Sequence, residues 1–184
     1  MMMMKKMLVM PLIAAGFMVS TLALAETQTV SLGYAHIRPQ EEKALNGAIL
    51  GYQYEFDNDW GVLGNVTFAK GGRKETDDFA KGDFKYYSLM AGPTYRINEY
   101  ISVYGQLGLA YFNAKFEANY DDGYSEHSSA SVTALGWGAG FIVNPMDNLA
   151  ITVGYEGSRF NFNGDNEGSK ASTNGFNVSL GYRF

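Results

Sequence analysis

The residues best suited to catalysis stand together in the second half of the chain. Glu126, His127 and Ser128 are consecutive, and a second serine follows at Ser129. A histidine beside a hydroxyl and a carboxylate could serve a hydrolase, but such a base has to be oriented by a fixed third group. The stretch is polar and typical of a loop. We therefore interpret it as part of a solvated external loop rather than as a catalytic centre.

Two further patterns are only superficially like ligand sites. Residues 161–168 read NFNGDNEG, whose oxygen-rich spacing is faintly like that of a calcium loop but lacks the bidentate glutamate of a full motif. Gly136, Gly138 and Gly140 alternate with other residues, but no helix follows them, so they are not a dinucleotide-binding fingerprint. The sequence therefore predicts no enzyme, no metal site and no cofactor.

The N-terminus has the pattern of a cleaved secretory signal. Lys5 and Lys6 form a basic start, residues 7–24 are almost entirely apolar, and residues 23–25 form a small-x-small cleavage site. An apolar run of this length could also cross a membrane as a helix, but no charged stop-transfer cluster follows it. We predict a signal peptide over residues 1–25 and a mature chain over residues 26–184.

Composition narrows the class of the mature chain. The net charge of −5 becomes −7 when Lys5 and Lys6 are removed, and this acidic balance argues against a nucleic-acid-binding protein. The chain has no cysteine, so an exported protein of this kind needs a source of rigidity other than disulfides. Its mean hydropathy is only −0.16, although 15% of its residues are aromatic. Strands with one apolar face resolve this contrast, because half of each strand can be apolar without raising the mean.

Eight segments alternate with a period of two. They cover residues 29–36, 45–56, 60–69, 84–97, 100–112, 132–143, 149–160 and 174–184. One parity carries no charge and is mostly apolar, as in Leu50 and Tyr52, whereas the other is largely small or polar, as in Gly51 and Gln53. This pattern predicts an all-β fold, an eight-stranded antiparallel transmembrane β-barrel.

The apolar face is expected to point outward, into lipid. The lumen of an eight-stranded barrel is just wide enough to be filled by side chains, so the many Tyr, Phe, Leu and Trp residues would overcrowd it. Aromatic residues also gather near the ends of the segments, as an interfacial girdle requires. A soluble lipocalin-like barrel would not need an uncharged outer face. The predicted location is therefore the bacterial outer membrane.

The connections between the segments alternate between short and long. Three are predicted tight turns with Asp or Asn, at residues 57–59, 98–99 and 144–148. Four are longer and polar, at residues 37–46, 70–83, 113–131 and 161–173. Short periplasmic turns and longer extracellular loops are the pattern of bacterial barrels. Pro93 falls within a strand and removes a ladder donor, so we expect a local bulge there.

Charged residues on the inward parity predict a polar network inside the barrel. Glu55, Arg96 and Arg183 all fall near the periplasmic ends of their segments and could form salt bridges that fill the lumen. Glu156 belongs to the same interior set but lies higher, with no inward basic residue at its depth. We expect it to meet Tyr104, Gln106 or water, or to be protonated.

Six short strings occur in order along the mature chain. They are SLGYA at 31–35, AGPTYRIN at 91–98, GWGAG at 136–140, NPMDN at 144–148, GYEGS at 154–158 and GYRF at 181–184. In order and spacing they resemble the Ail/Lom/OmpX family of enterobacterial outer membrane proteins. Members of this family carry the same proline that stands here at Pro93. The resemblance implies the eight-stranded fold. It also implies that Tyr182 and Phe184 belong to a C-terminal strand signal read by the barrel assembly machinery.

The resemblance further implies a function at the cell surface. Members of the family include virulence factors that mediate adhesion, invasion and resistance to serum complement, and others have no assigned role. We expect a non-enzymatic interaction protein, embedded in outer membrane lipid and lipopolysaccharide, whose partners are host extracellular matrix or complement-regulatory proteins. A structural envelope barrel without a dedicated partner is the first alternative, an outer-membrane lipid-modifying hydrolase the second, and a pore the last.

Binding is expected in loops 70–83 and 113–131. Loop 113–131 has a net charge of −3, so strong heparin binding is not indicated except by a basic cluster at the start of loop 70–83. Exposed aromatic residues among polar ones are suitable contact anchors. The candidate binding residues are Lys70, Arg73, Lys74, Phe79, Phe116, Tyr120 and Tyr124. Alternation continues on either side of these loops, so their strands could project beyond the bilayer and bind a partner by β-augmentation.

Overall fold

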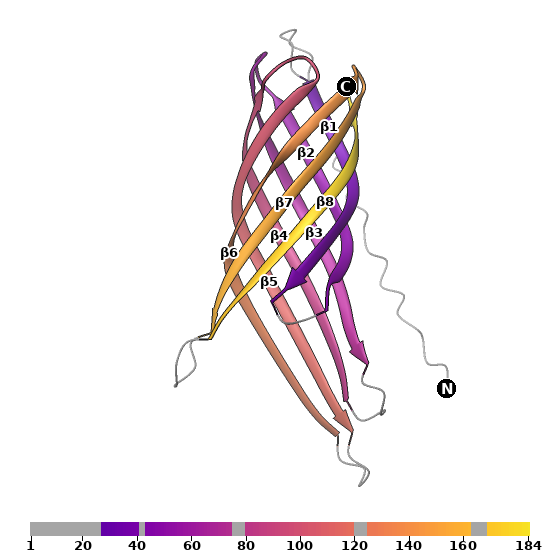
Figure 1. The fold of residues 1–184 in the computed structure, drawn as a ribbon, viewed down its shortest axis with the longest axis vertical. Coiled ribbons are helices and arrows are strands. Elements are labelled where there is room, and N and C mark those ends of the chain that lie inside the picture. The colour runs from indigo at the N-terminus through magenta and orange to yellow at the C-terminus, as the bar shows by residue number, and fades with distance from the viewer. Residues whose placement is uncertain (1–26, 41–42, 75–79, 120–124, 163–168) are drawn as a thin grey trace, which may run out of the picture.

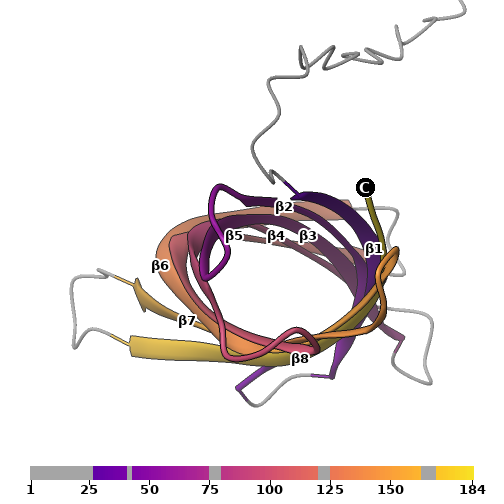
Figure 2. The same cartoon turned by 90° about the horizontal axis from the view of Figure 1, so that it is seen from above.

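The computed structural model describes residues 27–40, 43–74, 80–119, 125–162 and 169–184. Within them lie eight strands: β1 (Thr27–Pro39), β2 (Leu45–Glu55), β3 (Trp60–Lys74), β4 (Ala80–Arg96), β5 (Ile101–Asn119), β6 (Ser125–Met146), β7 (Leu149–Phe162) and β8 (Ser169–Arg183). Each strand pairs with its neighbours in antiparallel register, and β1 pairs with β8, which closes the barrel (Figures 1 and 2). The predicted fold class is confirmed. In the described part of the chain, no helix is long and apolar enough to cross a membrane.

Alternating burial explains why these segments form a barrel wall. Leu32 and Leu107 point outward with 63% and 66% of their surface exposed, whereas Thr67 and Tyr86 point inward and are fully buried. The outward residues are those of the apolar parity, so the face predicted to meet lipid does point away from the lumen. Such an apolar exterior is stable only where lipid replaces water.

Two aromatic belts ring the outer surface. Near the short-turn end the rings of Trp60 and Tyr95 pack across β3 and β4 with centroids 4.9 Å apart, and near the other end Phe68 and Tyr87 pack at 5.1 Å. Eight residue steps along β3 separate Trp60 from Phe68, which is about 26 Å of strand. With a tilt of roughly 40° this spans about 20 Å, close to the height of the apolar band of a bacterial outer membrane barrel.

The lumen is filled in layers. Inward residues along β3 run from Leu63 through Asn65 and Thr67 to Ala69. Leu63 belongs to a small apolar cluster near the short turns, and Ala69 to a larger one near the opposite end that also contains Phe84. The polar side chains of Asn65 and Thr67 lie between the two apolar clusters. The lumen is therefore packed with side chains, as expected for eight strands.

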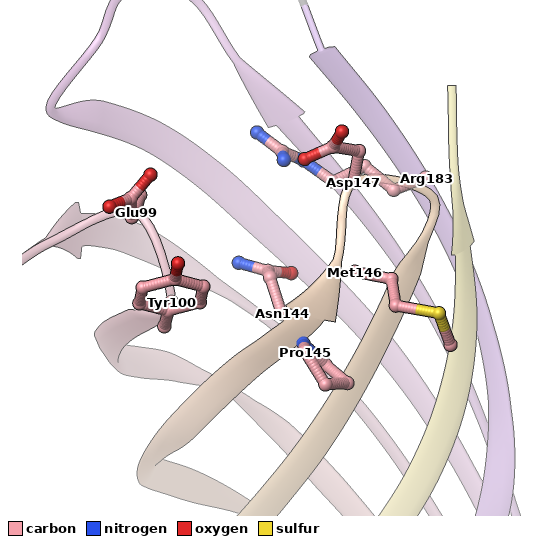
Figure 3. Close-up of a pocket in the computed structure, with 7 residues that line it drawn as sticks. All are labelled: Glu99, Tyr100, Asn144, Pro145, Met146, Asp147 and Arg183. Carbon is pink, nitrogen blue, oxygen red and sulfur yellow. The ribbon is translucent and has the colours of Figure 1, made fainter.

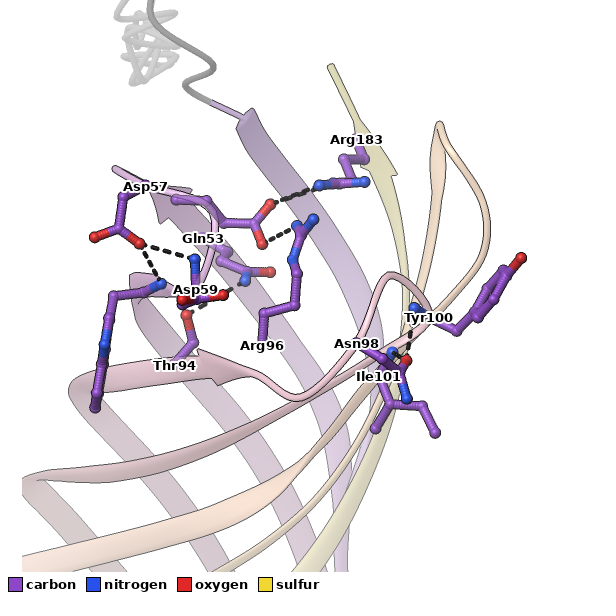
Figure 4. A network of polar contacts seen from close by, with 11 residues as sticks. Gln53, Asp57, Asp59, Thr94, Arg96, Asn98, Tyr100, Ile101 and Arg183 are labelled. Atoms are coloured by element: carbon purple, nitrogen blue, oxygen red, sulfur yellow. Dashed lines mark hydrogen bonds and ion pairs between the residues drawn. The ribbon is translucent and has the colours of Figure 1, made fainter.

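The short turns are held by side chains that bond their own backbone. Asp57 Oδ1 accepts hydrogen bonds from the backbone N–H groups of Asp59 and Trp60 at 2.8 and 2.7 Å. Asn98 Oδ1 accepts from Tyr100 and Ile101, both at 2.9 Å (Figure 4). These are the Asp- and Asn-based turns that the sequence predicts.

The structure corrects the predicted loops at the opposite end. Most residues of the expected loops 70–83 and 113–131 continue β3, β4, β5 and β6, so that only residues 75–79 and 120–124 fall outside the described strands. The loop predictions at 37–46 and 161–173 are likewise too long, because parts of both ranges are strand. The reason is that the backbone hydrogen bonds of the antiparallel ladder continue beyond the apolar band. Only the outward side chains change there, from apolar to polar.

The bulge expected at Pro93 is absent. On β5, Ala91 pairs with Leu107 and Thr94 pairs with Tyr104, so the register is the same on both sides of the proline. Pairing with β5 is interrupted at Gly92 and Pro93 and then resumes. The missing donor is therefore accommodated by a local gap in the ladder rather than by an extra residue.

Candidate functional site

Four strands extend past the rest of the barrel at the end opposite the short turns. The β2–β3 pairing stops at Asn46 and Lys70, whereas β3–β4 pairing continues to Lys74 and β5–β6 pairing continues to Asn119. Together the ends of β3, β4, β5 and β6 form a projecting sheet, which points away from the β7–β8 hairpin in Figure 1. This sheet is the part of the described barrel that projects furthest at this end (Figure 1).

One edge of the projecting sheet belongs to β6. Pairing between β6 and β7 ends at Leu135 and Arg159, while β6 itself begins at Ser125. Residues 125–134 therefore pair with β5 on one side and with no strand of the described structure on the other. Backbone N–H and C=O groups along such an edge are free to pair with an added strand.

The outward face of the projecting sheet carries a ladder of charges. Lys70 lies directly opposite Lys85 across β3 and β4, and Asp83 lies opposite Lys115 across β4 and β5. The first pair repels and the second attracts, since side chains directly opposite in antiparallel strands interact. Among the described residues neither Lys70 nor Lys85 forms an ion pair that would offset this repulsion. Lys85 is a member of this surface that the sequence analysis missed, because only the strand register places it opposite Lys70.

The candidate binding residues are only partly described by the structure. Lys70 is exposed on β3. The backbones of Arg73 and Phe116 both pair with Gly82 of β4, and Lys74 pairs with Lys81, but the side chains of these candidates are outside the described part. Three further candidates, Phe79, Tyr120 and Tyr124, lie entirely outside the described residues. The structure therefore places the start of the basic cluster and the strands that hold the two loops.

The hydrolase-like stretch is not a loop. Glu126 and His127 belong to β6, where their backbones pair with Ala118 and Glu117 of β5. Within the described residues no cluster of three or more His, Cys, Asp or Glu side chains could hold a metal ion. The oxygen-rich stretch 161–168 is outside the described residues except for Asn161 and Phe162, which end β7.

At the short-turn end, Glu55 binds two arginines inside the lumen. Glu55 Oε1 accepts from Arg96 Nη2, and Glu55 Oε2 accepts from Arg183 Nη2 and Nε at 3.0 and 3.2 Å (Figure 4). The three residues come from β2, β4 and the end of β8, so they link strands that are distant in sequence. Gln53 donates to Thr94 Oγ1 at 3.5 Å one layer further in.

Glu156 is separate from that cluster. Its carboxylate accepts hydrogen bonds from Thr67 Oγ1 at 3.1 Å and Ser88 Oγ at 3.3 Å, so it crosses the lumen from β7 to β3 and β4. The expected partner Gln106 instead accepts from Asn65 at 3.0 Å and donates to the carbonyl of Leu63 at 2.8 Å. Sequence reasoning missed Thr67 and Ser88, since the side chains that meet across a barrel depend on the stagger of its strands.

The C-terminal strand presents two aromatic rings outward. Tyr182 and Phe184 are about 60% exposed, and their ring centroids lie 6.1 Å apart. The backbone of Phe184 exchanges hydrogen bonds of 2.8 and 2.9 Å with Gln28 at the start of β1. The last residue of the chain therefore takes part in the closing seam of the barrel.

Comparison with known proteins agrees with this architecture. Residues 12–184 match the outer membrane protein β-barrel domain family. The chain is 41% identical to the attachment invasion locus protein of Yersinia pseudotuberculosis, over 98% of this chain and 97% of that protein. The chain belongs to the Ail/Lom/OmpX family. Another member, the virulence membrane protein PagC of Salmonella typhimurium, is 33% identical over 94% of this chain and 95% of its own length.

A solved structure of the Ail/Lom/OmpX family has the same fold. Ail from Yersinia pestis, in complex with the heparin analogue sucrose octasulfate, matches with a TM-score of 0.71 and 40% identity, covering 88% of this chain and all of that one. As a family member, the barrel lies in the bacterial outer membrane. Bacterial barrels keep their short turns in the periplasm, so the projecting sheet is extracellular and the Glu55 cluster is at the periplasmic mouth.

Proposed function

We propose that this barrel is a non-enzymatic surface protein that binds host macromolecules in adhesion, invasion or resistance to serum complement. The observation that carries the proposal is the projecting sheet of β3–β6 with its unpaired β6 edge. Relatives named for attachment, invasion and virulence support it, as does the complex of Yersinia pestis Ail with a heparin analogue. The partners that fit this role are extracellular matrix or complement-regulatory proteins.

The mode of binding that fits the sheet is β-augmentation. A peptide strand added along residues 125–134 would complete the backbone hydrogen bonds on the free side of β6. Residues 70–83 and 113–131, most of which belong to the projecting strands, would supply selectivity through charged and aromatic side chains. A rigid barrel that holds variable loops is a common arrangement for binding surfaces.

The Lys70–Lys85 pair supports a second partner, the anionic headgroups of lipopolysaccharide. Each lysine lies two residues beyond a ring of the outer aromatic belt, Lys70 after Phe68 on β3 and Lys85 before Tyr87 on β4. A two-residue step along a strand is about 7 Å, so the ammonium groups would reach the headgroups. A phosphate between the two lysines would convert their repulsion into two charge-assisted hydrogen bonds.

Alanine replacement of five candidate residues tests the proposal. The set is Lys70, Arg73, Lys74, Phe116 and Tyr120. None of them lies in the apolar band, so the folded barrel should persist, while adhesion to host cells and survival in serum should fall together. The competing view is a structural barrel without a dedicated partner. That view takes over if both phenotypes stay at the wild-type level, or if the wild type never exceeds a strain lacking the protein.

A further inference from the structure

A pocket opens at the periplasmic end of the barrel, away from the projecting sheet. Its volume is about 320 Å³, and it is lined by Glu99 and Tyr100 of the β4–β5 turn, by Asn144, Pro145 and Met146 at the end of β6, by Asp147 of the β6–β7 turn, and by Arg183 at the end of β8 (Figure 3). Residues from three separate stretches of the chain therefore meet around one cavity. Neither the surface function nor the packing of the lumen uses this cavity.

The walls of the pocket are fixed by backbone hydrogen bonds. The N–H of Asn144 donates to the carbonyl of Tyr100 at 2.8 Å, and the N–H of Arg183 donates to the carbonyl of Asn148 at 3.0 Å. The end of β6 is thereby fastened to the β4–β5 turn, and the β6–β7 turn is fastened to β8. Register between β6 and β7 shifts between Val143 and Met146. An irregularity of this kind bends a strand locally, and this one lies within the pocket wall.

Asn144 places an unused polar group in the cavity. Its residue surface is only 6% exposed, and none of the side-chain hydrogen bonds among the described residues involves it. In Figure 3 the amide lies between Tyr100 and Met146. The amide atoms of Asn144 are not among the fully buried atoms that lack a partner, so they remain in contact with the open pocket, where water or a ligand can complete their hydrogen bonds. The wall of the pocket therefore offers an amide that makes no other side-chain hydrogen bond and is suited to a polar ligand.

The charges around the pocket have opposite signs. Glu99 and Asp147 contribute carboxylates from two different turns, and within the described residues neither forms an ion pair. Arg183 bonds Glu55 through Nε and Nη2, which leaves Nη1 available. A carboxylate pair favours an ammonium group, while the free edge of a guanidinium favours a carboxylate.

We propose that this pocket binds a zwitterion with an ammonium group and a carboxylate, the head group of an amino acid. The ammonium would donate to Glu99 and Asp147, and the carboxylate would accept from Arg183 Nη1 and the Asn144 amide. The pocket faces the periplasm, where two sources supply this chemistry: free amino acids, and the diamino-acid ends of cell-wall stem peptides. The second source would attach the barrel to the cell wall at the end opposite its surface function.

The test uses the folded full-length mature barrel in lipid nanodiscs at low salt, because exposed charges are screened at high ionic strength. The first probe is meso-diaminopimelic acid, titrated while the side-chain amide signals of asparagine are followed by NMR. Its N-acetylated and carboxamide derivatives remove the ammonium and the carboxylate in turn. Binding that shifts the Asn144 amide and weakens about tenfold with either derivative supports the proposal.

Matched variants locate the site. Glu99→Gln and Asp147→Asn remove the proposed ammonium acceptors, whereas Asp59→Asn makes the same charge change on the β2–β3 turn, outside the pocket. The first two should weaken binding about tenfold each, and the third should leave it unchanged. Only variants that are folded are compared, as judged by a change in gel migration when the sample is boiled. If a variant does not fold, the series of derivatives measured on the wild type still tests the proposal.

Several results would overturn the proposal. They are no binding at millimolar probe, equal binding of the N-acetylated derivative, or equal binding by all three variants. A purified stem peptide that ends in the diamino acid separates the two sources. Tighter binding than the free amino acid assigns the site to the cell wall, and weaker binding assigns it to free amino acids.

Discussion

Lys70 and Lys85 lie directly opposite one another on the outer face of β3 and β4, immediately beyond the rings of Phe68 and Tyr87. Like charges in this position destabilise a sheet unless a counter-ion joins them. We propose that phosphate groups of the outer leaflet are the counter-ions that join this pair. The pair lies where the membrane-embedded wall continues into the projecting sheet.

Replacement of Lys85 by Gln should have opposite effects in two environments. In neutral detergent the unfolding midpoint should rise by about 1–2 °C, because the repulsion with Lys70 is removed. In bilayers with lipopolysaccharide the variant should lose part of the stabilisation that the lipid gives to the wild type. Thermal unfolding followed by gel shift measures both. Lys115→Gln is the matched control, since Lys115 lies opposite Asp83, and the same pattern in this control would refute the role of the pair.

Two single proline substitutions, at adjacent residues of β6, should distinguish the role of its free edge from that of its paired side. Consecutive residues of a strand direct their N–H groups to opposite neighbours, so one of Ser129→Pro and Ala130→Pro removes a ladder bond to β5 and the other removes only an edge donor. The edge variant should fold like the wild type and lose most of its binding to host cells. The other should unfold more readily. Full adhesion by a well-folded edge variant would exclude β-augmentation at this site.

Loss of the Glu55 carboxylate should destabilise the periplasmic mouth. Glu55→Gln leaves Arg96 and Arg183 inside the lumen without their shared anion, and removal of one partner from such a pair costs about 3 kcal/mol. Urea unfolding of the refolded barrel measures the change in free energy of unfolding. Asp59→Asn makes the same charge change on an exposed turn and should alter it little. Equal stabilities for the two variants would mean that the cluster only fills space.

Deletion of Phe184 should reduce the amount of protein in the outer membrane. Its ring faces outward beside Tyr182, and its backbone pairs with Gln28 at the barrel seam, so we propose that the barrel assembly machinery reads this end. Immunoblots of outer membrane fractions measure the level of the protein. The control variant Phe184→Tyr keeps an aromatic ring at this position and should retain most of that level. Normal levels after the deletion would contradict this role.

Period-two alternation was enough to predict the eight strands and the outward face, because Leu50 and its neighbours leave only one face for lipid. The tight turns could be predicted because Asp57 and Asn98 bond their own backbone. Continued alternation, with Phe112 and Ala114 on one parity, also predicted that β5 and β6 project beyond the bilayer, and the structure confirms this. Their exact ends could not be predicted, because polar residues on the outward face weaken the hydrophobic signal of a strand while its ladder continues. The partners of Glu156 were missed for a different reason: strand stagger, which decides that Thr67 and Ser88 face it, leaves no mark on local sequence.

The projecting sheet also has a consequence for how such a protein diversifies. Its hairpins continue the same ladders that cross the membrane, so adding or removing one residue on each strand changes their length by one rung and keeps every lower pair in register. A single insertion within the membrane-spanning part of one strand would instead turn the apolar side chains on one side of the insertion toward the lumen. Descendants of this chain can therefore vary the height of the extracellular platform in paired steps, while the part within the bilayer stays the same.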